Sequence, residues 1–247
     1  MNSLHYDKIS KEYEEVSSGI SKKYILDPTF RKLLGRLNGE SVVDLACGSG
    51  NSSRIVKEAG AGNVVGVDIS PGQIKLAKEN EKQNPMGIEY FTGDVADFDF
   101  SGIGRFDMAT GVFLLHYAPT RKDLLRMCEN ISTAIRSGGR FIGLNHHPDG
   151  NVMKEKKYGF SHVDSSAKDG HKRKVIYYRD DGSVLCEFCH YVWRRETYEN
   201  ALSAAGFRNI RWPSHIISEE GYSKFGKGFW KLYNSAPIIS GITFEKH

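Results

Sequence analysis

The chain has 247 residues, enough for one large domain or for one domain with a substantial insertion. It is 39% hydrophobic and 26% charged, which excludes disordered, collagen-like and coiled-coil classes. The formal net charge is +4, and residues 154–174 alone hold seven basic and three acidic side chains. Because the rest of the chain is therefore neutral, the charge argues against a protein that binds nucleic acid or membrane over its whole surface.

The sequence carries no signal for export or for membrane insertion. There is no run of 18 apolar residues, and residues 1–15 mix lysine and glutamate without the apolar stretch of a signal peptide. The four cysteines are then expected to be reduced thiols. We therefore expect a cytoplasmic protein with no membrane partner.

Up to residue 147, the pattern alternates between short apolar runs and amphipathic segments. Residues 1–40 have helical spacing, with a break or helix start at Asp27-Pro28, and are expected to form an N-terminal helical lid. In chain order, the following elements are a strand at 41–46, a glycine turn at 47–50, a helix at 53–59, a strand at 62–68, a helix from Ser70-Pro71 to about residue 83, strands at 87–92 and 106–113, a helix at 121–136 ended by Gly138-Gly139, and a strand at 140–145. Such alternation predicts right-handed crossovers and a parallel sheet covered on both faces, with residues 41–147 as its core.

The alternation stops after Pro148, and residues 148–194 are expected to form an insertion that acts as a substrate lid. Residues 151–174 are polar and basic, whereas 175–178 and 184–193 are extended runs joined across an Asp-Gly turn, which predicts an antiparallel hairpin. A helix at 196–205 follows. The last two strands, at 210–212 and 238–244, are expected to pair antiparallel at the sheet edge, so that residues 195–247 complete a single domain.

The glycine turn and the end of the second strand point to a nucleoside ligand. Glycines there let the backbone approach a ligand, and the acidic Asp68 can accept hydrogen bonds from ribose hydroxyls. The third glycine of a dinucleotide site is absent, no Gly-Lys-Ser/Thr of a P-loop follows, and Asp44 is a poor neighbour for a pyrophosphate. A ligand with a ribose, no phosphate and a cationic tail fits better, which indicates S-adenosylmethionine.

An ordered set of motifs then resembles the class I S-adenosylmethionine-dependent methyltransferases. The motifs are Asp44 to Gly50, Val64-Val65-Gly66-Val67-Asp68-Ile69-Ser70, Gly93-Asp94-Val95, Phe106-Asp107, Gly138-Gly139 and Ala205-Gly206-Phe207. More narrowly, Tyr6-Asp7-x-Ile9, His116-Tyr117-Ala118 and Gly228-Phe229-Trp230 are similar to toxoflavin-biosynthesis N-methyltransferases, which act on small molecules. The resemblance implies a Rossmann-like α/β fold with a mostly parallel seven-stranded sheet and an antiparallel insertion after the fifth strand.

The resemblance also implies roles for individual residues. The cofactor-binding positions would be Tyr6 and Tyr13 closing over the site, Ala46 and Gly48 beside the methionine, Asp68 at the ribose, Ile69, Asp94 and Val95 at the adenine, and Thr110 and Gly111 at the methionine ammonium. Methyl transfer from a sulfonium needs positioning more than acid or base chemistry. His116 is the candidate catalytic residue that faces the acceptor, although it is equally a satisfied histidine at a helix start. Tyr117, Asn145, His146 and His147 follow strands four and five, where the acceptor is expected.

Cys186-Glu-Phe-Cys189-His190 fits the pattern of covalent haem attachment, but alternation in a strand points the two cysteines to opposite faces. A zinc site needs a second ligand pair, and the histidines are scattered, so no metal is expected. The leading function is transfer of a methyl group to nitrogen or oxygen of a small aromatic or heterocyclic metabolite. The alternatives are an RNA methyltransferase that uses the basic segment, and a non-catalytic subunit that binds S-adenosylmethionine.

Overall fold

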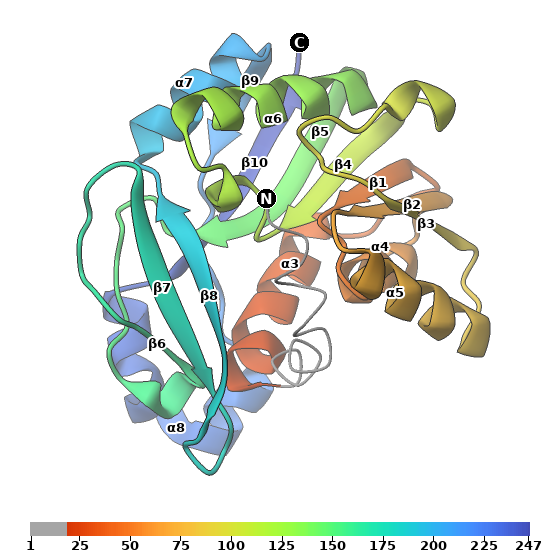
Figure 1. Cartoon of the computed structure of the whole chain (residues 1–247). Coiled ribbons are helices and arrows are strands. Elements are labelled where there is room, and N and C mark those ends of the chain that lie inside the picture. The colour runs from red at the N-terminus through yellow and green to blue at the C-terminus, as the bar shows by residue number, and fades with distance from the viewer. Residues whose placement is uncertain (1–18) are drawn as a thin grey trace.

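A seven-stranded sheet forms the centre of the computed structural model, which describes residues 19–247 (Figure 1). Its strands are β1 (Ser41–Leu45), β2 (Asn63–Asp68), β3 (Ile88–Thr92), β4 (Phe106–Val112), β5 (Ile135–His146), β9 (Phe207–Arg211) and β10 (Ile239–Lys246). Their order is β3-β2-β1-β4-β5-β10-β9, and β10 runs antiparallel to both of its neighbours. The expected Rossmann-like sheet and its antiparallel edge pair are therefore confirmed.

Helices cover both faces of this sheet because the strand residues are apolar on both sides. Along β1, Val42 packs with the residues of α3, α4 and α5, whereas Val43 and Leu45 pack with those of α6 and α7. The helices are α3 (Asp27–Leu34), α4 (Asn51–Glu58), α5 (Pro71–Gln83), α6 (Arg121–Ala134), α7 (Arg195–Ala204) and α8 (Glu219–Ser235), with short turns η1 (Lys22–Leu26), η2 (Phe100–Gly102), η3 (Leu115–Tyr117) and η4 (Lys156–Tyr158). Within residues 19–247, no helix is both long and apolar enough to cross a lipid bilayer.

The start of α5 shows how local sequence sets the helix boundaries. Ser70 is the N-cap, and its side chain accepts a hydrogen bond from the backbone N–H of Gln73 at 3.1 Å. Pro71 occupies the first turn, where its missing N–H costs no helical hydrogen bond. The helix predicted from this pair is confirmed.

The insertion after β5 forms a second, antiparallel sheet of β6 (Phe160–His162), β7 (His171–Tyr178) and β8 (Val184–Val192). The hairpin expected at Asp-Gly is confirmed, and Cys186 is buried while Cys189 is partly exposed. The strand β7 begins earlier than predicted and β6 was not predicted. Exposed Lys172 and Lys174 alternate with a buried arginine, so the first half of β7 has no apolar alternation to reveal it.

The start of β5 and the presence of α8 also differ from the prediction. β5 begins at Ile135, before the glycine pair, because Gly138 and Gly139 form an irregularity where the pairing of β4 with β5 shifts register. A Cβ on Gly139 would lie 2.7 Å from the carbonyl oxygen of Asp107, so the close approach requires glycine. The helix α8 was not predicted, since Gly226 and Gly228 interrupt its pattern.

A third core joins α8 to η1 and the insertion. Tyr158, Trp230 and Tyr233 are fully buried there, and the indole N–H of Trp230 donates to the carbonyl of Gly221 at 3.0 Å. Figure 1 shows α8 beside β6, β7 and β8, at the end of the molecule away from β3. This core fixes the position of the insertion relative to the carboxyl ends of β4 and β5.

Candidate cofactor and acceptor site

The glycine loop between β1 and α4 folds through several left-handed residues. Ala46, Gly48 and Gly50 have φ values of 57°, 55° and 92°. A Cβ on Gly50 would lie 2.5 Å from the hydroxyl oxygen of Tyr90, so this position needs glycine for two reasons. The loop consequently exposes backbone atoms without side chains at the carboxyl edge of the sheet, where a ligand can approach them.

Asp44 is the buried anchor beneath this loop. Its carboxylate accepts hydrogen bonds from the hydroxyls of Ser52, Ser53 and Thr110, each at 2.7 Å. Burial raises the pKa of Asp44, and the three hydroxyl donors oppose that shift. The side chain of Thr110 thus connects β4 to β1, and the expected role of its backbone at the methionine ammonium stays a prediction.

Asp68 lies at the end of β2 and organises the same loop. Its Oδ2 accepts from the backbone N–H of Gly48 at 2.9 Å, and its Oδ1 accepts from the backbone N–H of Ser70 at 2.9 Å. Its expected role as the acceptor for ribose hydroxyls stays a prediction. Ile69, next along the chain, is partly exposed, as contact with an adenine requires.

The adenine positions expected after β3 lie at the same edge. Asp94 is partly exposed and its Oδ1 accepts from the backbone N–H of Ala96 at 2.9 Å, while Val95 is buried under α6. Gly111 is buried in β4, where a Cβ would come within 3.0 Å of the ring of Phe141. Tyr6 and Tyr13 lie outside the described residues.

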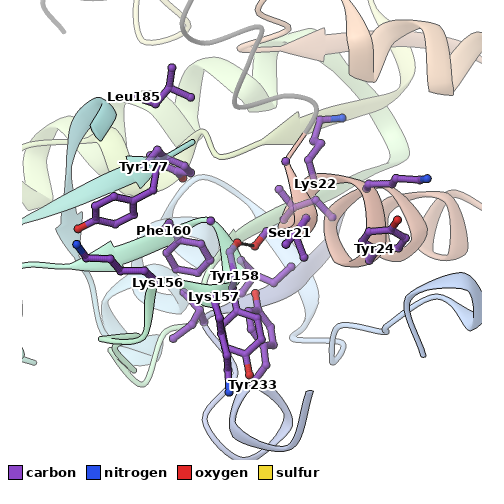
Figure 2. Close-up of a pocket in the computed structure, with 18 of the residues that line it drawn as sticks. Ser21, Lys22, Tyr24, Lys156, Lys157, Tyr158, Phe160, Tyr177, Leu185 and Tyr233 are labelled. Atoms are coloured by element: carbon purple, nitrogen blue, oxygen red, sulfur yellow. Dashed lines mark hydrogen bonds between the residues drawn. The ribbon is translucent and has the colours of Figure 1, made fainter. Parts of the chain in front are cut away.

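A large cavity of about 820 Å³ lies between η1, the insertion and the ends of β4 and β5. Figure 2 shows Phe160 and Tyr177 of the insertion across from Ser21 and Lys22 at the N-terminal end of the described chain. The Oγ of Ser21 donates to the carbonyl of Tyr158 at 2.7 Å, which joins the two walls. The aromatic residues that line the cavity are Tyr24, Phe113, Tyr117, Tyr158, Phe160, Tyr177, Tyr178, Phe188 and Tyr233.

A smaller cavity of about 50 Å³ lies beside the glycine loop, and its lining includes Ala46 and Gly48. Lys22, Leu26 and Val112 line both cavities. The large cavity therefore adjoins the loop that is expected to hold the methionine end of the cofactor. A methyl group carried there would face the aromatic cavity.

The walls of the large cavity have more basic than acidic side chains. The basic ones are Lys22, Lys23, Lys156, Lys157, Arg179 and Lys224, and the acidic ones are Asp180 and Asp181. Lys156 lies over the ring of Tyr178 at 4.4 Å from the centroid, whereas Lys157 pairs with Glu155 at 2.8 Å. The basic segment recognised in the sequence thus contributes directly to this cavity.

The expected catalytic residue does not line the cavity. His116 is 1% exposed, and its Nδ1 lies 2.6 Å from the Oδ1 of Asn145, which makes Nδ1 the donor. Burial lowers the pKa of His116 to about 4, while the hydrogen bond to Asn145 opposes that shift. Because η3 turns this ring inward against Tyr117 and His146, the ring of His116 does not contact the space in which an acceptor would bind.

Of the other residues that were expected to contact the acceptor, some line the large cavity and others do not. Tyr117 lines the cavity, whereas Asn145 is 1% exposed and directs its side chain to His116. His147 turns toward Asp149, whose backbone N–H donates to its Nδ1 at 3.3 Å, and it does not line the cavity. His146, between them, does line it, because alternation along β5 directs this side chain oppositely to its neighbours.

Sequence reasoning missed a cluster behind His146. His146, His162 and His190 bring one ring nitrogen each within 4.8 Å of one another, although they come from β5, β6 and β8. The scattered positions in sequence concealed this grouping. The alternation of Cys186, Phe188, His190 and Val192 was the available signal, since it places His190 on the inward face of β8.

Comparison with known proteins finds similarity to methyltransferases in the first half of the sheet. Residues 42–139 match the family model of a methyltransferase domain. The ubiquinone biosynthesis O-methyltransferase of Bordetella avium is 28% identical over 120 residues, 48% of each chain, so this chain spans about half of that relative's length. The N-demethylindolmycin N-methyltransferase of Streptomyces griseus is 26% identical over 173 residues, 70% of this chain and 71% of that one.

Solved structures agree on the fold of the whole chain. An S-adenosylmethionine-dependent methyltransferase from Mesorhizobium loti superposes with a TM-score of 0.63 at 20% identity, covering 94% of this chain and 100% of that one. Together with the domain match over residues 42–139, this confirms the expected Rossmann-like methyltransferase fold. S-adenosylmethionine stays the expected cofactor, and the left-handed glycine loop and the Asp68 carboxylate that binds it lie together where the resemblance would place the methionine and the ribose.

Proposed function

We propose that this chain, whose residues 42–139 are a methyltransferase domain, transfers the methyl group of S-adenosylmethionine to nitrogen or oxygen of a small aromatic or heterocyclic metabolite. The observation that carries the proposal is the aromatic cavity of about 820 Å³, which shares Lys22, Leu26 and Val112 with the cavity at the glycine loop. A flat acceptor there would stack on aromatic rings and present one atom toward the loop.

The residues would act by binding, orientation and exclusion of water. The bound cofactor supplies a methyl group already activated by its sulfonium, so no strong acid or base is required. Asp68 would fix the ribose, and the backbone of the glycine loop would border the methionine. Phe160 and Tyr177 would hold the acceptor plane, and His116 would support the cavity wall from behind.

The finer resemblance to toxoflavin-biosynthesis N-methyltransferases favours nitrogen as the methylated atom. Two curated relatives, one an N-methyltransferase and the other an O-methyltransferase, support a small acceptor in general. Analysis of the methylated product is therefore needed to decide between nitrogen and oxygen. Mass spectrometry of the methylated compound identifies the atom.

The test has two stages. Calorimetry with S-adenosylmethionine measures cofactor binding, and a panel of aromatic and heterocyclic metabolites, together with RNA, is then screened for release of S-adenosylhomocysteine. We expect binding, and release with a subset of flat metabolites. Binding without release from any metabolite would favour the non-catalytic alternative, and release only with RNA would favour the RNA methyltransferase.

A further inference from the structure

One face of the insertion sheet gathers buried side chains that carry nitrogen. Arg173 of β7 is paired with His190 of β8, and His162 of β6 is paired with Val175, two residues along β7 from Arg173. Residues two apart on a strand share a face, so Arg173, His162 and His190 lie on the same side. His146 stacks on His190 with ring centroids 3.8 Å apart, and these four residues form what we call the histidine–arginine cluster.

Among the described residues, no carboxylate forms a salt bridge with the charged member of this cluster, although Asp164 acts on Arg173 at longer range. Arg173 is 2% exposed, and its guanidinium donates to the backbone carbonyls of Gly150, Asn151 and Ser166. In the part of the chain that the structure describes, it forms no salt bridge, and Asp164 already accepts from His171 at 2.8 Å. A buried cation that is held by backbone carbonyls, with its carboxylate partner only at longer range, can stabilise a negatively charged ligand.

The same charge acts on the histidines. Burial, followed by the charge of Arg173 and a backbone hydrogen bond that opposes them, lowers the pKa of His162 to about 4. Burial is also the largest cause that lowers the pKa of His146 and of His190, and neighbouring histidines and Arg173 add to it. All three rings are consequently neutral at pH 7, and Arg173 is the cation of the cluster.

His162 offers a hydrogen-bond donor to this space. Its Nδ1 accepts from the backbone N–H of Met153 at 3.0 Å, so the neutral ring carries its proton on Nε2. Over residues 19–247, the Nε2 of His162, the Nε2 of His190 and the Nε of Arg173 are buried without a hydrogen-bond partner. Buried polar atoms are nearly always paired in folded proteins, so three of them in one cluster point to a ligand.

The chemistry of the cluster disfavours a metal ion, although the spacing of the three imidazoles suits one. A metal-bound histidine presents a lone pair to the ion and donates with its other nitrogen. His162 does the reverse, since its Nδ1 is occupied as an acceptor and its Nε2 carries the proton. The adjacent guanidinium of Arg173 would also repel a divalent cation.

We propose that the histidine–arginine cluster binds an ionised oxygen of the methyl acceptor, a carboxylate or a phenolate, and so selects anionic aromatic acceptors. His146 belongs both to the cluster and to the wall of the large cavity, so it marks where the acid group of a ligand in that cavity meets the cluster. The basic side chains along the cavity would attract such a ligand. This inference rests on the proposed function for the identity of the cavity.

The test compares benzoate with benzamide, which have similar shapes but differ in charge, on the full chain with and without S-adenosylmethionine. Dissociation constants are measured by ligand-observed NMR titration. We expect the wild type to bind benzoate at least ten-fold more tightly than benzamide. His162→Phe should abolish this preference, whereas His162→Gln should keep it, because glutamine can accept from Met153 with Oε1 and donate with Nε2.

Thermal unfolding and cofactor affinity show whether each variant is folded. A second variant, Arg173→Met, should also abolish the preference. Equal affinities for benzoate and benzamide in the folded wild type would overturn the proposal, as would stoichiometric Zn²⁺ binding that His162→Gln and His190→Phe remove. Failure to bind S-adenosylmethionine, with the benzoate preference intact, would instead overturn the proposed function and leave the anion site standing.

Discussion

At the scale of single residues, Asp68 holds the backbone of Gly48 and of Ser70 with its two carboxylate oxygens, and it is the residue that we expect to bind the ribose. Asp68→Ala removes the expected ribose acceptor and loosens the loop. We expect S-adenosylmethionine affinity to fall by about 2 to 3 kcal/mol, roughly 30- to 150-fold, as measured by calorimetry. Asp68→Asn, which keeps one acceptor oxygen, should lose less. Wild-type affinity in Asp68→Ala would contradict the site assignment.

Thr110 provides a second prediction at this scale. Thr110→Val leaves the buried carboxylate of Asp44 with two hydroxyl donors in place of three. We expect the free energy of unfolding in urea to fall by about 1 to 3 kcal/mol. Thr110→Ser keeps the hydroxyl and serves as the control. Wild-type stability in Thr110→Val would contradict this role of the hydroxyl group.

At the scale of elements, α8 contains a residue that only glycine suits. Gly226 has φ 76° and ψ 160° inside the helix, which kinks there. Gly226→Ala is expected to lower the free energy of unfolding by about 1 to 3 kcal/mol. Gly228→Ala, in the same helix with nothing within 4 Å of its added Cβ, should be neutral or stabilising by up to about 1 kcal/mol. Similar urea midpoints for the two variants would contradict this role of the kink.

The same helix shows what the sequence can and cannot reveal about elements. The strands up to β5 and the start of α5 were predicted because their signals are local, namely apolar runs and the Ser70-Pro71 cap. The helix α8 was missed because its glycines lower helix propensity and its stability comes from tertiary packing. Trp230 and Tyr233 are buried against Tyr158 of the insertion, a contact that no local pattern encodes.

At the scale of the whole molecule, the two halves of the site differ in how far the sequence predicts them. The cofactor positions follow one another along β1, β2 and β3, so their motifs are short and readable. The histidine–arginine cluster brings together β5, β6, β7 and β8, and the buried Arg173 sits among exposed lysines in sequence. Only the register of the sheet shows that Arg173 faces His190, so the polar and basic pattern of residues 151–174 did not predict this part of the site.

The buried histidines also make the stability of the whole molecule depend on pH. The pKa of His116 and that of His162 are lowered to about 4 in the folded chain, chiefly by burial, against about 6.5 when unfolded. Between these values the unfolded chain binds more protons, so folding stability falls as the pH decreases below about 6.5. Each of these histidines contributes a loss of about 1.4 kcal/mol per pH unit, while the raised pKa of Asp44 opposes it.

We therefore expect urea unfolding at pH 7.5, 6.5, 5.5 and 5.0 to show nearly constant stability above pH 7 and a steep decline below pH 6.5. His162→Gln replaces one of these rings by a group that does not titrate, so its slope between pH 6 and 5 should be shallower by about 1.4 kcal/mol per pH unit. An identical slope in the wild type and the variant would show that His162 is protonated in the folded chain. That outcome would also contradict the hydrogen bond from the backbone N–H of Met153, because a protonated ring has no lone pair at Nδ1 to accept it.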